Sequence, residues 1–287
     1  MTPQSAGPPP QAEQLPGMTL YRDIVVDQPL GYRPLLLDLL TPAGQGPFPL
    51  LVHIYGGGFA GGSHKTDSLG GYLVERCVPE GFAVARVQYR HSKEAIFPAQ
   101  IHDVKAAVGW LRQHATAVQL DPERFASWGS SSGGHLSAML AVSARHPLLD
   151  GDRASTTSSA VQAAISWNGP VNIGRLPPPP VESPFHQLGE DPHEWLLGAP
   201  ASSAPELAVA ASTSSYPTAL AAPLMLVHGE LDDGIPIDQS EELAAAYRAV
   251  GADVTLVRVP GAGHFFADGD RERLVTQGIQ FLRSRLG

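Results

Sequence analysis

Residues 121–137 read DPERFASWGSSSGGHLS, and within them Gly129-Ser130-Ser131-Ser132-Gly133 has the pattern G-x-S-x-G. The pattern follows a short strand-like run and precedes an expected helix. A nucleophile on a sharp strand-to-helix turn needs small residues two positions before and after it, because neighbouring backbone passes close by. Only Ser131 has glycine at both places. In isolation such a run is more typical of a flexible loop, but its flanking elements favour a turn with Ser131 as nucleophile.

On both sides of this turn, strand-like runs alternate with helix-like ones. This alternation indicates an α/β fold with a mostly parallel central sheet flanked by helices. The first two strands are joined by a short turn and are expected to form an antiparallel edge. The expected strands are 20–26, 33–40, 49–55, 82–89, 124–128, 163–169, 223–229 and 254–260, and the expected helices include 98–118, 236–251 and 271–285.

Two segments depart from this alternation. Residues 1–17 are rich in proline and are predicted to be a disordered tail, so that the domain covers residues 18–287. Residues 171–222 contain four consecutive prolines, and a compact domain seldom carries so long an irregular loop without a use for it. We expect a lid-like insertion over the active site, partly helical at 193–197. The alternative is a surface excursion without a role.

The composition indicates which classes of partner and which cellular compartment to expect. The net charge is −9 and no basic run occurs, so neither nucleic acid nor an anionic membrane surface is an expected partner. The first residues lack the positive start and apolar core of a secretory signal, and no apolar run approaches a membrane span. Cys77 is the single cysteine, which excludes an intramolecular disulfide and is compatible with a reducing compartment. These features favour a cytoplasmic location.

A serine nucleophile requires a base and a group that orients the base. Of eleven histidines, His264 lies in the Gly-rich loop PGAGHFF (260–266) directly after a late strand. Asp232 and Asp233 compete for the orienting acid in LVHGELDDGIP, and Asp232 has the expected distance from the end of its strand. The resulting chain order Ser131, Asp232, His264 differs from the orders of the chymotrypsin and subtilisin types.

Backbone N–H groups are also needed to stabilise the negative charge of a tetrahedral intermediate. The residue after the nucleophile, Ser132, is expected to supply one of them. Gly56, Gly57 and Gly58 follow the buried strand PLLVHIY, and without side chains their backbone can approach a substrate. Taken alone, three glycines after a strand are equally typical of a plain turn.

Together these segments resemble the α/β-hydrolases related to hormone-sensitive lipase, close to the acetyl-xylan and feruloyl esterase-like branch. The resemblance rests on YGGGF (55–59), FPAQIHDVKAAVGWLRQHA (97–115), residues 121–137, PLMLVHGELDDGIP (223–236) and PGAGHFF. It implies a serine esterase without metal or cofactor, with Ser131, Asp232 and His264 as the catalytic triad. It also implies Gly57 and Gly58, beside Ser132, as oxyanion donors. One departure is Tyr55, which stands where the family's HGGG motif has histidine.

The predicted reaction is hydrolysis of a small carboxylic ester, with a short-chain acyl or aryl group, through an acyl-enzyme. Tyr55, Phe59, Trp167 and Phe265 lie near the motifs and are candidates to line a substrate pocket, although core packing is the alternative for each. The same residues could cleave a small amide or formamide. A non-catalytic binding protein on the same scaffold is the remaining alternative, although such a protein is expected to have lost a member of the triad.

Overall fold

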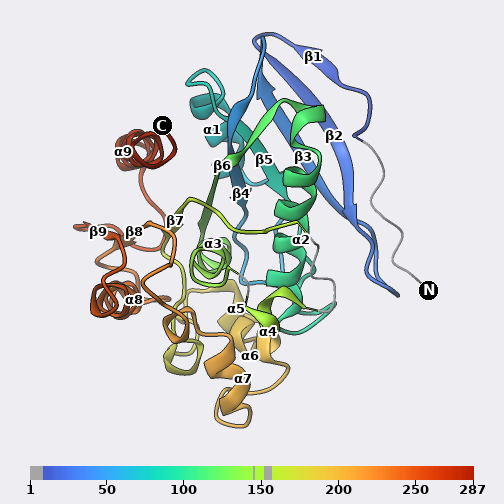
Figure 1. Cartoon of the computed structure of the whole chain (residues 1–287). Helices are drawn as coiled ribbons and strands as arrows, with labels where there is room; N and C mark the ends of the chain where they lie inside the picture. The colour runs from blue at the N-terminus through green and yellow to red at the C-terminus, as the bar shows by residue number, and fades with distance from the viewer. Residues whose placement is uncertain (1–8, 145, 152–156) are drawn as a thin grey trace.

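The protein is built around one twisted sheet (Figure 1). The computed structural model describes residues 9–144, 146–151 and 157–287. In this part of the chain the sheet has nine strands in the spatial order β1-β2-β3-β5-β4-β6-β7-β8-β9. The strands are β1 (Glu13–Leu15), β2 (Met18–Asp27), β3 (Leu35–Pro42), β4 (Phe48–Ile54), β5 (Ala83–Val87), β6 (Leu120–Ser130), β7 (Ala163–Trp167), β8 (Leu224–Gly229) and β9 (Val254–Val259).

The six strands from β5 to β9 in this order are parallel, whereas β1, β2 and β3 form an antiparallel edge. Both arrangements confirm the expectation from sequence. The prediction that residues 1–17 form a disordered tail is wrong for residues 13–15, because β1 pairs with β2. Residues 1–8 lie outside the described residues.

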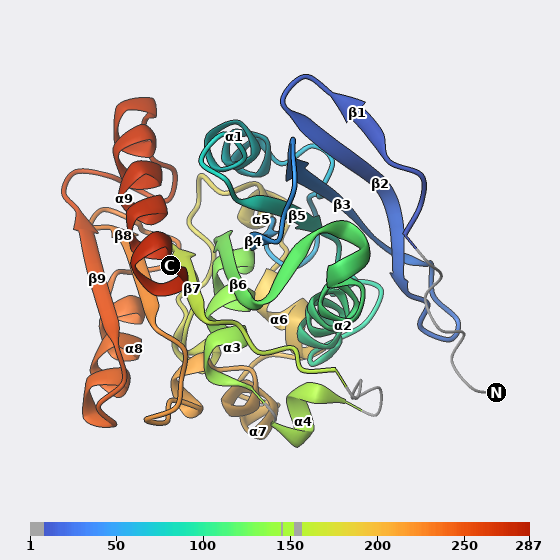
Figure 2. The ribbon, with the colours of Figure 1, turned by 45° about the horizontal axis from the view of Figure 1, so that its top comes forward.

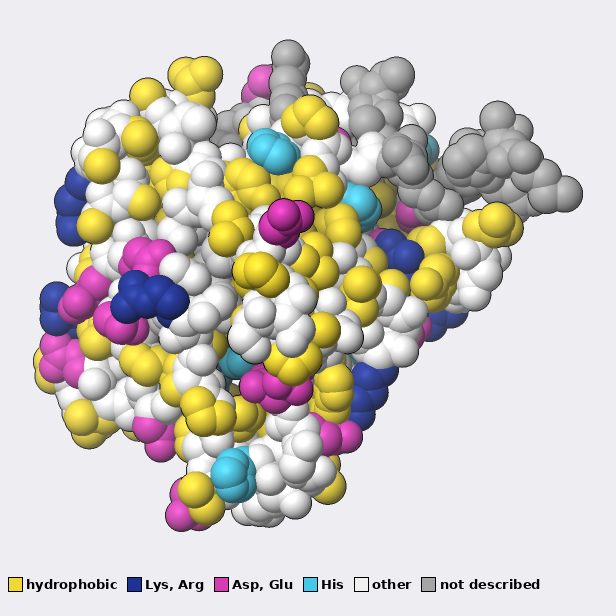
Figure 3. Space-filling view, turned by 90° about the horizontal axis from the view of Figure 1, so that it is seen from below, with side chains coloured by type: hydrophobic (Ala, Val, Ile, Leu, Met, Phe, Trp, Pro, Cys, Tyr) yellow, Lys and Arg dark blue, Asp and Glu magenta, His cyan; other side chains and the backbone are white. Residues whose placement is uncertain are grey.

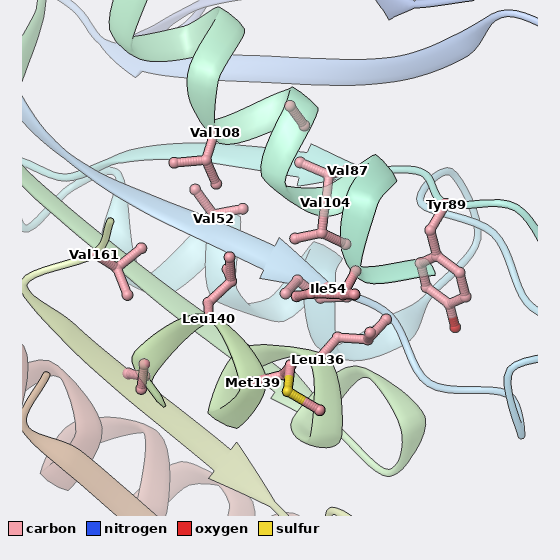
Figure 4. Close-up of a cluster of buried hydrophobic side chains, with 14 of the residues drawn as sticks. Val52, Ile54, Val87, Tyr89, Val104, Val108, Leu136, Met139, Leu140 and Val161 are labelled. Carbon is pink, nitrogen blue, oxygen red and sulfur yellow. The ribbon is translucent and has the colours of Figure 1, made fainter. Parts of the chain in front are cut away.

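Helices cover both faces of the sheet, because the side chains of each central strand alternate between the two faces and both sets are apolar. Helices α2 (Ala99–Gln113), α3 (Ser132–Val142) and α8 (Asp238–Ala249) pack on the face that includes Val52 and Ile54. Figure 4 shows part of this core. Helices α1 (Ser68–Cys77) and α9 (Asp268–Leu286) pack on the opposite face, as Figure 2 shows.

The segment 171–222 forms short helices instead of one long loop. They are the 3-10 helices η2 (Ile173–Arg175) and η3 (Thr213–Ser215), and the α-helices α5 (Pro184–Gln187), α6 (Pro192–Leu197) and α7 (Pro205–Ala210). Each α-helix begins with proline, whose missing N–H would have no partner in a first helical turn. The helices α5, α6 and α7 gather at one end of the molecule (Figure 1). The expected helix at 193–197 corresponds to α6.

Two further short helical elements of the described residues are α4 (Pro147–Asp150) and the 3-10 helix η1 (Ala115–Val118). Among the helices of the described residues, none is both long and apolar enough to cross a membrane.

Candidate active site

Ser131 lies at the sharp turn between β6 and α3. Its backbone has φ 54° and ψ −126°, a conformation that a residue with a side chain rarely adopts. The surrounding chain holds it there, because the Ser131 N–H donates to the Trp167 carbonyl oxygen at 2.8 Å and its carbonyl oxygen accepts from His135 N–H at 3.0 Å. Such strained residues concentrate at functional sites.

The two glycines around Ser131 are required sterically. A Cβ on Gly129 would clash with the carbonyl oxygen of Gly133, and a Cβ on Gly133 would clash with that of Ile54 at the end of β4. The turn therefore folds back on itself and against the neighbouring strand. This close approach is the physical reason for the G-x-S-x-G spacing.

Asp232 and His264 form a hydrogen-bonded pair. His264 Nδ1 lies 2.6 Å from Asp232 Oδ2, while Asp232 Oδ1 accepts the N–H groups of Gly234 and Ile235 at 3.1 and 2.9 Å. Because a carboxylate oxygen only accepts, Nδ1 carries the proton and Nε2 is left as the basic nitrogen. Asp232 is buried, whereas Asp233 is exposed. Of the two aspartates that compete in the sequence, Asp232 is thus the one that the structure pairs with His264.

A second histidine supports the turn that carries Asp232. His228 is fully buried at the end of β8, with Nδ1 2.7 Å from Ser240 Oγ and Nε2 2.7 Å from the Ile235 carbonyl oxygen. Burial lowers its pKa because it disfavours the charged imidazolium. His228 is therefore a neutral structural group that holds Ile235, whose N–H bonds Asp232.

The loop of glycines after β4 reaches Ser131 through Gly56. A Cβ on Gly56 would lie 3.2 Å from the Ser131 Cβ. Gly57 and Gly58 have φ of 139° and 60°, which favour glycine, and a Cβ on Gly57 would clash with the Gly61 carbonyl oxygen. Ser132 is the first residue of α3. Its N–H belongs to the free N-terminal turn of that helix, where negative charge is stabilised.

Tyr55, predicted as a pocket residue, instead anchors this glycine loop from within the core. Its ring stacks on Tyr89 with centroids 4.5 Å apart, and its hydroxyl lies 3.1 Å from His91 Nε2. The Tyr89 hydroxyl donates to the Tyr55 carbonyl oxygen at 3.2 Å and lies 3.4 Å from Ser132 Oγ. Tyr55 is 1% exposed and does not line an open pocket. The sequence did not indicate Tyr89 and His91 as partners of the glycine loop, because both follow β5, whereas the loop follows β4.

Of the other three candidate pocket residues, two lie in the core as Tyr55 does, and one lies at the surface. Phe59 is buried with its ring edge-to-face against His135, and Trp167 is buried between Trp128 and Phe266. Phe265 is 87% exposed, and its ring lies 5.1 Å from that of His264. Of the four, only Phe265 is positioned to meet a substrate from solvent.

The segment 171–222 reaches the glycine loop through α5 and α6. A Cβ on Gly58 would lie 2.6 Å from Phe185 Cζ and 3.1 Å from Pro192 Cβ, so both side chains rest on this glycine. Figure 3 shows this end of the molecule, where hydrophobic side chains are spread among polar ones. A groove of about 360 Å³ lies between α6 and the loop at Ser92 and Lys93, and its lining does not include Ser131, Asp232 or His264.

Asp23, Asp38 and His64 form a cluster with the composition of a metal site, their ligand atoms lying within 4.8 Å of one another. However, Lys65 Nζ lies 2.7 and 2.9 Å from the two Asp38 oxygens and 2.8 Å from Asp23 Oδ1. Arg86 Nη2 also lies 3.3 Å from Asp38 Oδ2, so two positively charged side chains, Lys65 and Arg86, balance the two carboxylates. Burial raises the pKa of Asp38, but the hydrogen bonds from Lys65 and the Asp23 N–H outweigh it and lower the pKa overall. We interpret the cluster as an ion pair that ties residues 61–65 to β3.

Replacing Lys65 by methionine should destabilise the protein by about 2 kcal/mol at neutral pH, because the buried Asp38 loses two charge-assisted hydrogen bonds and keeps only the more distant Arg86 as counter-charge. In the natural protein the lowered pKa makes Asp38 stabilising above its unfolded-state pKa of about 3.9, and that contribution is lost as the pH falls through the folded-state pKa. In the variant, Arg86 remains beside Asp38, but without the ammonium burial favours the protonated acid more than in the natural protein. The difference between the two proteins should therefore shrink as the pH falls.

Urea unfolding at pH 7 and pH 4.5 measures this difference. Lys93→Met is the matched control, because Lys93 pairs with Glu190 at the surface and should contribute within about 1 kcal/mol. Equal losses in the two variants, or a loss that does not change with pH, would refute the interpretation.

Comparison with known proteins shows the family and the fold of the chain. A family model described as BD-FAE matches residues 37–247. The chain is 30% identical over 255 residues to Esterase LipQ of Mycobacterium tuberculosis, an alignment that covers 87% of this chain and 59% of LipQ. The chain thus spans less than two thirds of that curated relative.

Two solved structures resemble the chain over nearly its whole length. A truncated carbohydrate esterase from gut microbiota is 26% identical, with a TM-score of 0.79 and coverage of 93% of this chain and 95% of that one. The esterase Est2 of Thermogutta terrifontis, solved with propionate bound, is 25% identical, with a TM-score of 0.73 and coverage of 94% of both chains. With its parallel sheet and the match of the family model, the chain belongs to the BD-FAE family and has the α/β-hydrolase fold.

Proposed function

We propose that the protein is a serine carboxylesterase that hydrolyses small carboxylic esters through an acyl-enzyme. The observation that carries the proposal is the strained Ser131 at the end of β6, with the hydrogen-bonded Asp232–His264 pair on the loops after β8 and β9. In a parallel sheet these strand ends meet at one edge. The esterase names of LipQ and Est2 support the same chemistry.

In the proposed mechanism, Ser131 Oγ attacks the ester carbonyl carbon while His264 Nε2 takes its proton. The carbonyl electron pair moves onto the oxygen, which the N–H of Ser132 and those of the glycine loop (Gly56, Gly57, Gly58) stabilise. The bond to the alcohol oxygen then breaks, and this oxygen leaves with the proton from His264. A water molecule repeats both steps on the acyl-enzyme and releases the acid. Asp232 stays ionised and holds the imidazole.

The surroundings of the glycine loop favour a short acyl group. Phe185 and Pro192 rest on Gly58, which limits the space beside the oxyanion donors, and helices α5 and α6 are thus the part of the proposed 171–222 lid that lies over the site. The propionate in the Est2 structure supports a short acyl group as well. Phe265, exposed beside His264, offers an aromatic face to an aryl alcohol on the leaving side.

A fluorophosphonate probe and a panel of p-nitrophenyl esters test the proposal. We expect one covalent adduct, located on Ser131 by mass spectrometry, and kcat/KM at least about tenfold higher for acetate and propionate than for octanoate, since each misfitting methylene costs about 1–3 kcal/mol. A matched p-nitroanilide distinguishes amide cleavage, the second candidate reaction. Faster anilide than ester hydrolysis would indicate an amidase, and absence of labelling would indicate a binding protein.

A further inference from the structure

Asn168 follows β7, the strand that lies between the strand of Ser131 and the strand that leads to Asp232. Its backbone is in the left-handed region with φ 45°, which asparagine tolerates better than most residues, and its N–H donates to the Val227 carbonyl oxygen at 2.9 Å. The preceding residue, Trp167, accepts the Ser131 N–H. Residues 167 and 168 thus contact the nucleophile on one side and β8 on the other.

Both ends of the Asn168 carboxamide are bonded, and to different loops. Oδ1 accepts the Gly229 N–H at 3.0 Å, three residues before Asp232, and Nδ2 donates to the His264 carbonyl oxygen at 2.6 Å. Because one partner is a donor and the other an acceptor, the two bonds fix the orientation of the amide. Asn168 is 2% exposed, so water does not compete for either partner.

The loop that carries His264 has few other attachments. Residues 263–266 form no helix or strand, and among the described residues the Asn168 amide makes the one hydrogen bond that reaches their backbone. The preceding part of the loop is held to the acid loop, since Leu231 N–H donates to the Ala262 carbonyl oxygen at 2.8 Å. The final position of the His264 backbone therefore depends on Asn168.

We propose that Asn168 is a positioning residue that keeps the base loop and the acid loop in register with the nucleophile. This proposal rests on the proposed esterase function. Asn168 does not contact the reacting atoms. It fixes the backbone from which the His264 ring reaches Asp232, and a displacement of about 1 Å at such a site can cost about 100-fold in rate.

Two substitutions separate the contributions of the amide. Asn168→Gly keeps the left-handed backbone accessible and removes both side-chain bonds. Asn168→Asp keeps an acceptor for the Gly229 N–H but, when ionised, places an oxygen against the His264 carbonyl oxygen. When protonated, the same carboxyl group can donate to that carbonyl. Asn172→Gly is the matched control, because Asn172 donates to Glu242 Oε1 at 2.9 Å and reaches neither loop.

We expect Asn168→Gly to lower kcat for p-nitrophenyl acetate about 10- to 100-fold and to change KM less than about threefold. This combination is expected when the lost interaction matters in the transition state and not for substrate binding. The ratio of Asn168→Asp to natural activity should rise as the pH falls, whereas the ratio for Asn168→Gly stays constant. Asn172→Gly should keep natural kcat. Thermal unfolding of all variants shows which remain folded at the assay temperature.

The outcomes distinguish the two proposals. If the natural protein neither labels with fluorophosphonate nor hydrolyses esters, the proposed function is wrong. If the natural protein is active but the two Asn168 variants match Asn172→Gly in kcat, or lose activity only in proportion to unfolded protein, the role of Asn168 is wrong. Loss of activity in Asn168→Asp with the same pH dependence as the natural protein would also overturn it.

Discussion

Replacing Ser131 by alanine should lower kcat for p-nitrophenyl acetate by about 10⁴- to 10⁶-fold, because the variant lacks the oxygen that forms the acyl-enzyme. The remaining rate should reflect the oxyanion donors and substrate binding alone. Alanine keeps the Cβ that already occupies this strained position, so the turn between β6 and α3 should persist. Steady-state kinetics, with circular dichroism to verify folding, measures the effect.

Ser130→Ala is the control for this experiment. Ser130 is the adjacent serine at the end of β6 and carries no proposed catalytic role, so its variant should remain within about threefold of the natural rate. Natural activity in Ser131→Ala, or equal losses in both variants, would show that Ser131 is not the nucleophile.

Asp232→Asn should lower kcat by about 10⁴-fold, the size of effect expected when the base is held in the wrong tautomer. The cause lies in the local hydrogen bonds. The Oδ1 position accepts two backbone N–H groups, from Gly234 and Ile235, so the amide oxygen must remain there. The amide nitrogen then faces His264 Nδ1 and donates to it. The imidazole proton moves to Nε2, which can no longer accept the proton of Ser131.

Asp233→Asn provides the matched comparison, because Asp233 is the exposed neighbour with the same chemistry. We expect its kcat to stay within about twofold of the natural value, as for most surface substitutions. The reverse ranking of the two variants, measured over a pH series, would assign the acid to Asp233.

The central features of the fold could be predicted because their causes are local in sequence. Continuous apolar runs identified the buried parallel strands, and Gly129 marked the turn because its lack of a Cβ is required by the backbone of Gly133, which is close to it in the chain. The expected Asp232 and His264 followed from chain order. Their hydrogen bond agrees with that expectation.

Features that depend on distant contacts could not be predicted in this way. The strand β1 has three residues without apolar alternation, and it exists because β2 pairs with it. Helix α1 contains Gly70, a poor helix former whose site leaves no room for a Cβ beside the His53 ring. No sequence pattern pointed to Asn168, because the two hydrogen-bond partners of its side chain lie 61 and 96 residues away in the chain. An aromatic side chain can line a pocket or fill the core, and only the packing shows that Tyr55 and Phe59 belong to the core.

Tyr55, which stands where the resembling family has histidine, affects how the glycine loop responds to the salt concentration. Burial raises the pKa of Tyr55 and lowers that of its partner His91, which also bonds the backbone of Gly62. Both groups are therefore uncharged throughout the neutral range, and a contact between uncharged groups is not screened by dissolved ions. The glycine loop should consequently keep its shape in concentrated salt, where an anchor built on an ion pair would loosen.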